Sequence, residues 1–167
     1  MRTHPPRTPP GGFSLVEVLI AVVVFSLGLG GISLMMMTSV RGTVEAGNET
    51  MAAMQAATLA ELILLNPSLT GHYINPTEAT SDCLAPARCS TQEWAAGNLA
   101  RWQAELERNL EHATGMVCRD STPFDGQGGS PECDGSGNTV VKVFWAEQTH
   151  PEEADDGMRR SVMPIPD

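Results

Sequence analysis

The chain has 167 residues, a formal net charge of −10 and 18% charged residues. This length is enough for one domain beyond a membrane segment. The acidic balance argues against a nucleic-acid-binding surface, which has to be basic, and it favours a basic partner or a solvated surface.

The N-terminal region combines a short basic segment with a long apolar stretch. Residues 1–12 are rich in proline and carry Arg2, Arg7 and no acidic residue, and Val18 to Val40 are 23 residues without a charge. As a helix this stretch would be roughly 35 Å long, which is enough to cross a hydrocarbon core of about 30 Å. We therefore predict a membrane-spanning helix. The arginines before it predict a cytoplasmic N-terminus, with the rest of the chain across the membrane.

Glu17 stands at the start of the apolar stretch. A carboxylate within the bilayer costs about 3 kcal/mol unless it has a partner. If the chain is cut after Gly12, the new α-amino group belongs to Phe13, four residues before Glu17. This amine is a ready partner for Glu17, in the same chain or on a neighbouring helix, and the pair would set the axial register of packed helices. The alternative is a signal anchor whose Glu17 only caps the positive end of the helix.

The segment Gly12-Phe13-Ser14-Leu15-Val16-Glu17, followed by the unbroken apolar helix, resembles the class III signal of type IV pilins and type II secretion pseudopilins. The resemblance implies cleavage after Gly12 by a prepilin peptidase, N-methylation of Phe13 and a role for Glu17 in assembly. A secretory signal peptide is disfavoured, because its apolar region would be shorter and would end at a small-residue cleavage site.

Helical periodicity continues beyond the apolar stretch. The helix that begins at Phe13 is expected to run about 53 residues, until Asn66-Pro67 ends it. An apolar stripe at helical spacing predicts a face that packs on a globular domain. The stripe consists of Val44, Met51, Met54, Leu62 and Leu65. The expected divisions are a leader at 1–12, a membrane or filament-core half-helix at 13–40, an amphipathic half-helix at 41–66 and a globular periplasmic head at 67–167.

The head contains all four cysteines. An even number in a translocated domain indicates two disulfides and an oxidising periplasm, and no Cys-x2-Cys pair suggests zinc. Three connectivities are possible. The simplest is Cys83–Cys89, which closes a local loop within residues 66–92, together with Cys118–Cys133, which pins a long glycine-rich loop.

Beyond the first loop we expect one helix and then strands. Ser90 and Glu93 fit a capping box for a helix of about twenty residues, ending near His112. Its apolar face predicts core positions rather than a ligand platform, and it comprises Trp94, Leu99, Trp102, Leu106 and Leu110.

Strands are predicted at 114–119, 139–146 and 159–165. The last one ends in Pro164-Ile165-Pro166, which suits an edge strand. In the middle strand, alternation places Val141, Val143 and Trp145 on one face and Val140, Lys142 and Phe144 on the other.

A long helix, a second helix and a small antiparallel sheet with disulfide-bounded loops make an α+β fold. This is the layout of the pilin family. Asp82-Cys83 with Cys89, the Trp94/Trp102 helix and the segments 59–66 and 141–147 are similar to type IV pilus modification proteins, the PilV family of minor pilins.

That resemblance implies a minor pilin that primes or modulates type IV pilus assembly, with adhesion, twitching or DNA uptake downstream. The implied location is the inner membrane, with a single pass, and then the pilus at low copy. The implied partners are prepilin peptidase, other minor pilins, the major pilin and the inner-membrane assembly platform, without direct nucleic-acid binding.

Motifs for catalysis and phosphate binding are absent from the sequence, so we predict neither an enzyme nor a cofactor. His150 with Glu152 and Glu153 is interpreted as a solvated acidic segment rather than a metal site. The carboxylates of the 120–138 loop, Asp120, Asp125 and Asp134, could bind calcium, but they lack the EF-hand spacing and are interpreted as turn formers.

Three alternatives stay open. The signal segment does not separate a minor pilin from a minor pseudopilin of a type II secretion system. A signal-anchored periplasmic enzyme or binding module would keep its N-terminus and contain a pocket. A tip adhesin would use the exposed loop at 120–138.

Overall fold

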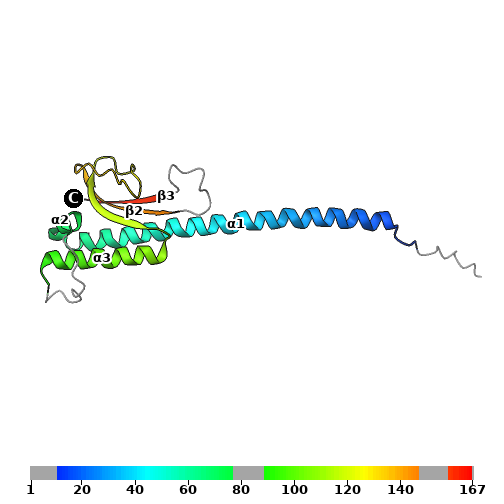
Figure 1. Cartoon of the computed structure of the whole chain (residues 1–167), viewed down its shortest axis with the longest axis horizontal. Coiled ribbons are helices and arrows are strands. Elements are labelled where there is room, and N and C mark those ends of the chain that lie inside the picture. Colours follow the sequence, from blue (N-terminus) through cyan, green and yellow to red (C-terminus); the bar gives the residue numbers. More distant parts are fainter. Residues whose placement is uncertain (1–10, 77–88, 147–157, 167) are drawn as a thin grey trace, which may run out of the picture. The chain divides into compact units, whose positions relative to one another are not determined.

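The computed structural model describes residues 11–76, 89–146 and 158–166. Its helices are α1 (Leu15–Leu64), η1 (Pro67–Leu69), α2 (Thr70–Ile74) and α3 (Thr91–Asn109), and its strands are β1 (Thr114–Asp120), β2 (Asn138–Ala146) and β3 (Met158–Ile165) (Figure 1). This arrangement confirms the predicted α+β fold. The chain divides into two compact units, Met1–Gly42 and Thr43–Asp167.

The first unit contains the apolar part of α1. Among the described residues, α1 is the one helix long and apolar enough to cross a membrane by length and composition. Its described side chains up to Gly42 are all exposed. Residues 11–42 therefore form no core of their own, and their apolar surface needs lipid or other helices around it.

In the second unit, the C-terminal part of α1 buries a face made largely of alanine. Ala52, Ala56 and Ile63 are 0–1% exposed, whereas Met54 and Leu65, from the predicted stripe, are 61% and 78% exposed. Leu62 packs partly against the core as predicted, but the predicted packing face of α1 is wrong at the other four positions of the stripe. Alanine has no side chain beyond Cβ, so this face lets α3 and the sheet approach the helix closely. The indole N–H of Trp102 donates to the Gln55 carbonyl at 2.9 Å across the α1–α3 contact.

The start of the segment predicted as a loop at 66–92 is helical instead. Pro67 is the first residue of η1. Proline has no backbone N–H, but the first residues of a helix donate no intrahelical hydrogen bond, so none is lost. Helix α2 follows, and its Tyr73 is 1% exposed. The Asn98 amide of α3 donates to the Tyr73 hydroxyl at 3.3 Å, and burial raises the pKa of that hydroxyl. This contact explains why the prediction failed, because tertiary packing stabilises a helix too short to form alone.

Helix α3 begins with the predicted capping box. The Glu93 N–H donates to Ser90 Oγ, and the Ser90 N–H donates to the Glu93 carboxylate at 2.7 Å. The Ser90 N–H and, next, the Ser90 hydroxyl both donate to the Glu93 carboxylate and hold its pKa below its usual value. The helix ends at Asn109, near the predicted end, and Trp102 lies in the core as expected while Trp94 is half-buried against it.

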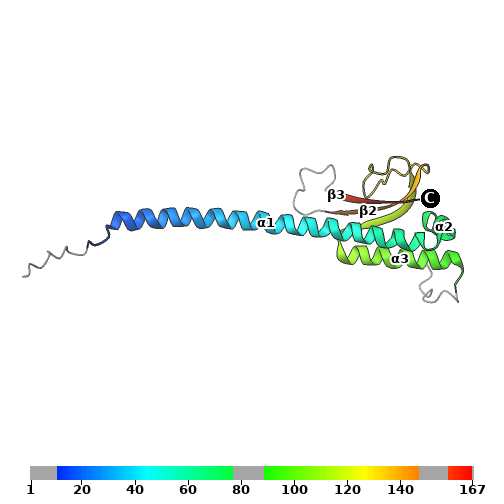
Figure 2. The same cartoon turned by 180° about the vertical axis from the view of Figure 1, so that it is seen from behind.

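The sheet is antiparallel with the strand order β1-β2-β3, so β3 is an edge strand as predicted. The helix-facing side of β2 carries Val141, Val143 and Trp145, which belong to the main core. The alternation on β2 is confirmed, but its other face is buried too, since Lys142 is 0% exposed. Figure 2 shows the sheet and α3 alongside the C-terminal part of α1.

Candidate functional site

The residues of the predicted cleavage site lie where α1 begins. Gly11 to Ser14 precede the helix in irregular backbone. The Val18 N–H donates a backbone hydrogen bond to the Ser14 carbonyl at 3.2 Å, just before the start of α1. Gly12 and Phe13 are exposed, Phe13 at 84%. The Gly12–Phe13 peptide bond is therefore accessible and free of helical hydrogen bonds, as a protease substrate requires.

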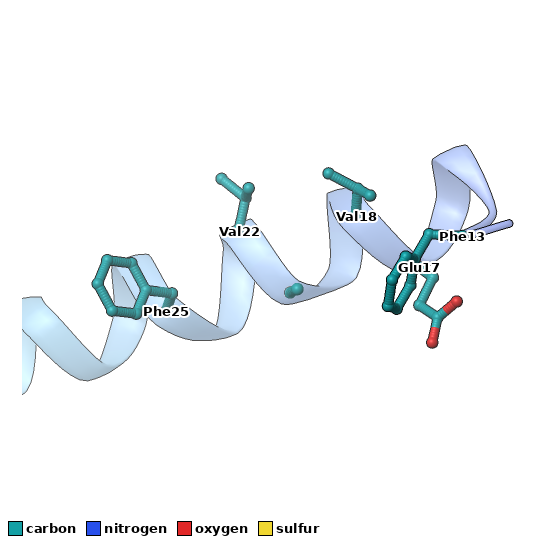
Figure 3. Close-up of a pocket in the computed structure, with 6 residues that line it drawn as sticks. Phe13, Glu17, Val18, Val22 and Phe25 are labelled. Atoms are coloured by element: carbon teal, nitrogen blue, oxygen red, sulfur yellow. The ribbon is translucent and has the colours of Figure 1, made fainter.

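Phe13 and Glu17 lie on the same side of the chain at this end of α1. Both line an open, mostly apolar depression, and Figure 3 shows the Glu17 carboxylate pointing away from the helix beside the Phe13 ring. The depression continues along the helix through Val18, Ala21, Val22 and Phe25. The arrangement places a carboxylate next to the residue whose α-amino group cleavage would release.

Three hydroxyl side chains of the apolar segment are satisfied by their own helix. Ser26 donates to the Val22 carbonyl at 2.7 Å, and Ser33 donates to the Leu29 carbonyl at 2.9 Å. Thr38 does the same toward the carbonyl one turn earlier. These hydroxyls can therefore enter lipid without losing hydrogen bonds. Glu17 has no ion-pair partner among residues 11–76, 89–146 and 158–166, so its charge needs a partner from elsewhere.

The second predicted feature, the disulfide Cys118–Cys133, is present, with the two Cα atoms 6.2 Å apart. It joins β1 to the loop between β1 and β2. Cys89 is disulfide-bonded. Cys83 lies outside the described residues, so the pairing Cys83–Cys89 stays a prediction. His150, Glu152 and Glu153 also lie outside the described residues.

A buried lysine holds the 121–137 loop over the outer face of β2. The Lys142 ammonium pairs with Asp120, a side chain that is also fully buried, and it lies 3.1 Å from the Asp125 carboxylate. It also donates to the carbonyl of Pro131 at 2.8 Å. The ammonium thus sits among carboxylate and carbonyl oxygens, a set of acceptors that elsewhere surrounds a metal cation.

The carboxylates considered for calcium consequently have protein partners. Asp120 and Asp125 face Lys142, and Asp134 accepts hydrogen bonds from Ser121 and from the Ser136 N–H, the latter at 2.7 Å. The Ser121 hydroxyl chiefly holds the pKa of Asp134 down, to about 2. The Thr122 hydroxyl, and to a lesser degree Lys142, lower the pKa of Asp125. These acids are structural elements of the loop.

Asp120 also lies close to the sulfur atoms of Cys118 and Cys133. Sulfur atoms joined in a disulfide are not thiolates and do not serve as thiolate metal ligands. Cys118, Asp120 and Cys133 therefore hold the 121–137 loop on the sheet through the disulfide and the ion pair with Lys142.

Sequence reasoning placed Lys142 on the outer face of β2 without assigning it a role. The available signal was a lysine inside a run of β-branched and aromatic residues, preceded in the sequence by a loop that contains several aspartates. A lysine in a continuous apolar strand is rarely buried without a paired acid, so that context predicts an ion pair.

One family profile, described as the prokaryotic N-terminal methylation motif, matches residues 10–33. The match covers the Gly12–Phe13 bond, Glu17 and the first turns of α1. No curated protein and no solved structure gives a significant match to the chain.

Proposed function

We propose that this chain, a type IV pilin-like protein, is a minor pilin that primes or modulates the assembly of a type IV pilus. The match of residues 10–33 to the N-terminal methylation motif carries the proposal. That motif indicates a structural subunit rather than an enzyme. The long apolar helix and the disulfide-bonded α+β head are consistent with a membrane-anchored pilin.

In this proposal, α1 holds the precursor in the inner membrane by a single pass. Its N-terminus faces the cytoplasm before cleavage, and the head lies in the periplasm, where Cys118–Cys133 can form. Prepilin peptidase cuts after Gly12, and the new Phe13 amine is N-methylated. The exposed, irregular backbone at Gly12 supports this step, because a protease binds an extended segment more readily than a helix.

Glu17 then acts in assembly. Its carboxylate pairs with the Phe13 amine, in the same chain or in a neighbouring subunit, and the pair removes the cost of a lone charge in an apolar surrounding. Because the pair forms at one axial position, it fixes the register of adjacent helices. The partners are other minor pilins, the major pilin and the inner-membrane assembly platform, and incorporation occurs at low copy at or near the tip.

The test of processing is intact-mass and peptide mass spectrometry of the membrane-extracted protein. The expected mature chain begins at N-methyl-Phe13. Gly12→Ala should leave the precursor uncut, whereas Gly11→Ala, one position away from the scissile bond, serves as the matched control and should be cut. A wild-type chain that keeps residues 1–12 in cells with active peptidase would overturn the proposal and favour a signal anchor.

The test of assembly uses Glu17→Ala and Glu17→Val. Both variants should be cleaved normally but should be depleted from sheared pili by about tenfold, which corresponds to the loss of about 1.4 kcal/mol. Glu49→Ala, which removes an exposed acid from the same helix outside the apolar segment, is the control. Normal amounts of the Glu17 variants in pili would show that this carboxylate has no part in incorporation.

A minor pseudopilin of a type II secretion system is the second candidate, because the motif at 10–33 fits it equally. Deletion of the gene separates the two functions. Loss of pili with intact protein secretion supports the pilin, and loss of secretion with intact pili supports the pseudopilin.

A further inference from the structure

The buried pair of Lys142 and Asp120 lies in apolar surroundings. Both side chains are 0% exposed, and Val140 and Phe144, which stand on the same face of β2 as Lys142, are buried with them. The 121–137 loop closes over this face. Burying two charges is costly because they lose their hydration. An amide between the two side chains carries no charge, so its formation would remove that cost.

The contact between Lys142 and Asp120 is not a hydrogen bond. It is made at Asp120 Oδ2, and this buried oxygen has no hydrogen-bond partner in the described part of the chain. The Lys142 amine donates instead to the Pro131 carbonyl at 2.8 Å and to the Asp125 carboxylate at 3.1 Å. A nitrogen that touches a carboxyl group without donating to the touched oxygen is placed as a nucleophile toward the carbon.

The groups around the pair supply the rest of an acyl-transfer site. The Thr122 N–H donates to the other oxygen of Asp120, Oδ1, at 2.9 Å, so it polarises the carbonyl and can stabilise negative charge on that oxygen. The Thr122 hydroxyl donates to Asp125 at 2.6 Å and holds this carboxylate beside the amine. A carboxylate within reach of the amine can move its protons.

We propose that Lys142 Nζ and Asp120 Cγ form an intramolecular amide bond, with Asp125 as the proton relay. One proton passes from Nζ through Asp125 to Asp120 Oδ2, which leaves a neutral amine beside a carboxylic acid. The amine lone pair attacks Cγ, and the carbonyl electron pair moves onto Oδ1, where the Thr122 N–H stabilises it.

The carbonyl then re-forms as the Cγ–Oδ2 bond breaks. A second proton follows the same route from Nζ, so Oδ2 leaves as water. The nitrogen keeps its third hydrogen, which the Pro131 carbonyl accepts. One ammonium and one carboxylate become one amide and one water, so the reaction needs neither an oxidant nor a reductant. The amide would tie the end of β1 to β2 even when Cys118–Cys133 is reduced. It requires only residues of the head and is independent of the proposed function.

The experiment is peptide mass spectrometry of the full chain, extracted in detergent and reduced before digestion. Thermal stability does not separate an amide from an ion pair, because both hold the loop on β2. Trypsin cuts after unmodified lysine and arginine, so an amide at Lys142 should abolish that cut. The expected fragment then runs from residue 120 to residue 159 and is lighter than its sequence by one water. Chymotryptic cleavage after Phe124 should leave the two resulting pieces joined.

Three variants assign the roles, and the fraction of joined fragment is followed over time after cell-free synthesis into detergent. Lys142→Arg keeps a cation but has no nucleophilic amine, so it should give no joined fragment. Asp125→Asn should form the amide at least about a hundredfold more slowly. The Asp125 side chain is 44% exposed, so this variant leaves the buried pair in place. Asp134→Asn is the matched control, because Asp134 bonds Ser121 and Ser136, and it should react like the wild type.

A wild-type chain that trypsin cuts normally after Lys142, with both fragments at full mass, would overturn the proposal. Loss of one water with a normal cut after Lys142 would also overturn it, because that result indicates a succinimide at an Asp-Gly pair of the loop. Equal rates for Asp125→Asn and the wild type would refute the relay.

Discussion

Replacing Lys142 with methionine tests whether the buried ion pair holds the loop on the sheet. Methionine has a similar length and stays compatible with the apolar neighbours on β2, but it carries no charge. Lys142 and Asp120 are both 0% exposed at their side chains, so the substitution leaves the Asp120 carboxylate buried without its cation. Removing one partner of a buried pair costs about 3–5 kcal/mol. The Pro131 carbonyl also loses its donor.

For a domain of this size, about 4 °C of melting temperature corresponds to 1 kcal/mol, so Lys142→Met should lower Tm by roughly 12–20 °C. The assay is thermal unfolding of the full chain in detergent with disulfides intact, followed by near-ultraviolet circular dichroism of the tryptophans. Lys142→Met/Asp120→Asn should recover much of the loss because no uncompensated buried charge remains, since the Asp125 side chain is 44% exposed. Arg108→Met, on the exposed side of α3, is the surface control. A Tm shift below about 3 °C, or no recovery in the double variant, would refute the reasoning.

Three further predictions concern the head. Gly115→Val should destabilise by about 1–3 kcal/mol, because a Cβ at this position would lie 2.3 Å from the Trp102 ring; Gly129→Val, where a Cβ meets nothing within 4 Å, is the control, and equal denaturation midpoints would contradict the packing. Asp134 has a folded-state pKa of about 2, below its ordinary 3.8, so its hydrogen bonds stabilise the loop above about pH 4 and are lost as pH falls toward 2. The protection factors of the loop amides, which divide out the intrinsic pH dependence of exchange, should fall over that window in the wild type, and unchanged protection factors would argue against this role. Ser90→Ala should cost about 1 kcal/mol by removing the cap of α3, measured by chemical denaturation, whereas Ser90→Gly should cost only a few tenths of that.

Local sequence determined the elements that depend on nearest neighbours. The stretch Val18–Val40 is uncharged and, as a helix, is longer than the hydrocarbon core of a bilayer is thick. Its own composition therefore predicts a helix without reference to the rest of the fold. The Ser90–Glu93 box begins α3 because its donors and acceptors lie within one turn. The alternation at 139–146 specifies the two faces of β2, and the even number of cysteines indicates disulfides. The Gly12–Glu17 segment is likewise local, since the N-terminal methylation motif that matches residues 10–33 is a linear pattern.

Tertiary structure decided which faces of those elements are covered. The periodicity of α1 supports two faces, one apolar through Met51 and Met54 and the other through Ala52 and Ala56. The head packs on the second, because small side chains permit a closer approach than long ones. Helix α2 forms because Tyr73 is buried against α3, and this contact spans 25 residues of sequence. The role of Lys142 is decided the same way. Its acids come from the end of β1 and from the loop, and only the antiparallel pairing of β1 with β2 brings them to the ammonium. The free energies of helix packing, of Tyr73 burial and of the Lys142 ion pairs all depend on contacts between segments that are distant in the sequence. A short window of sequence therefore does not predict them.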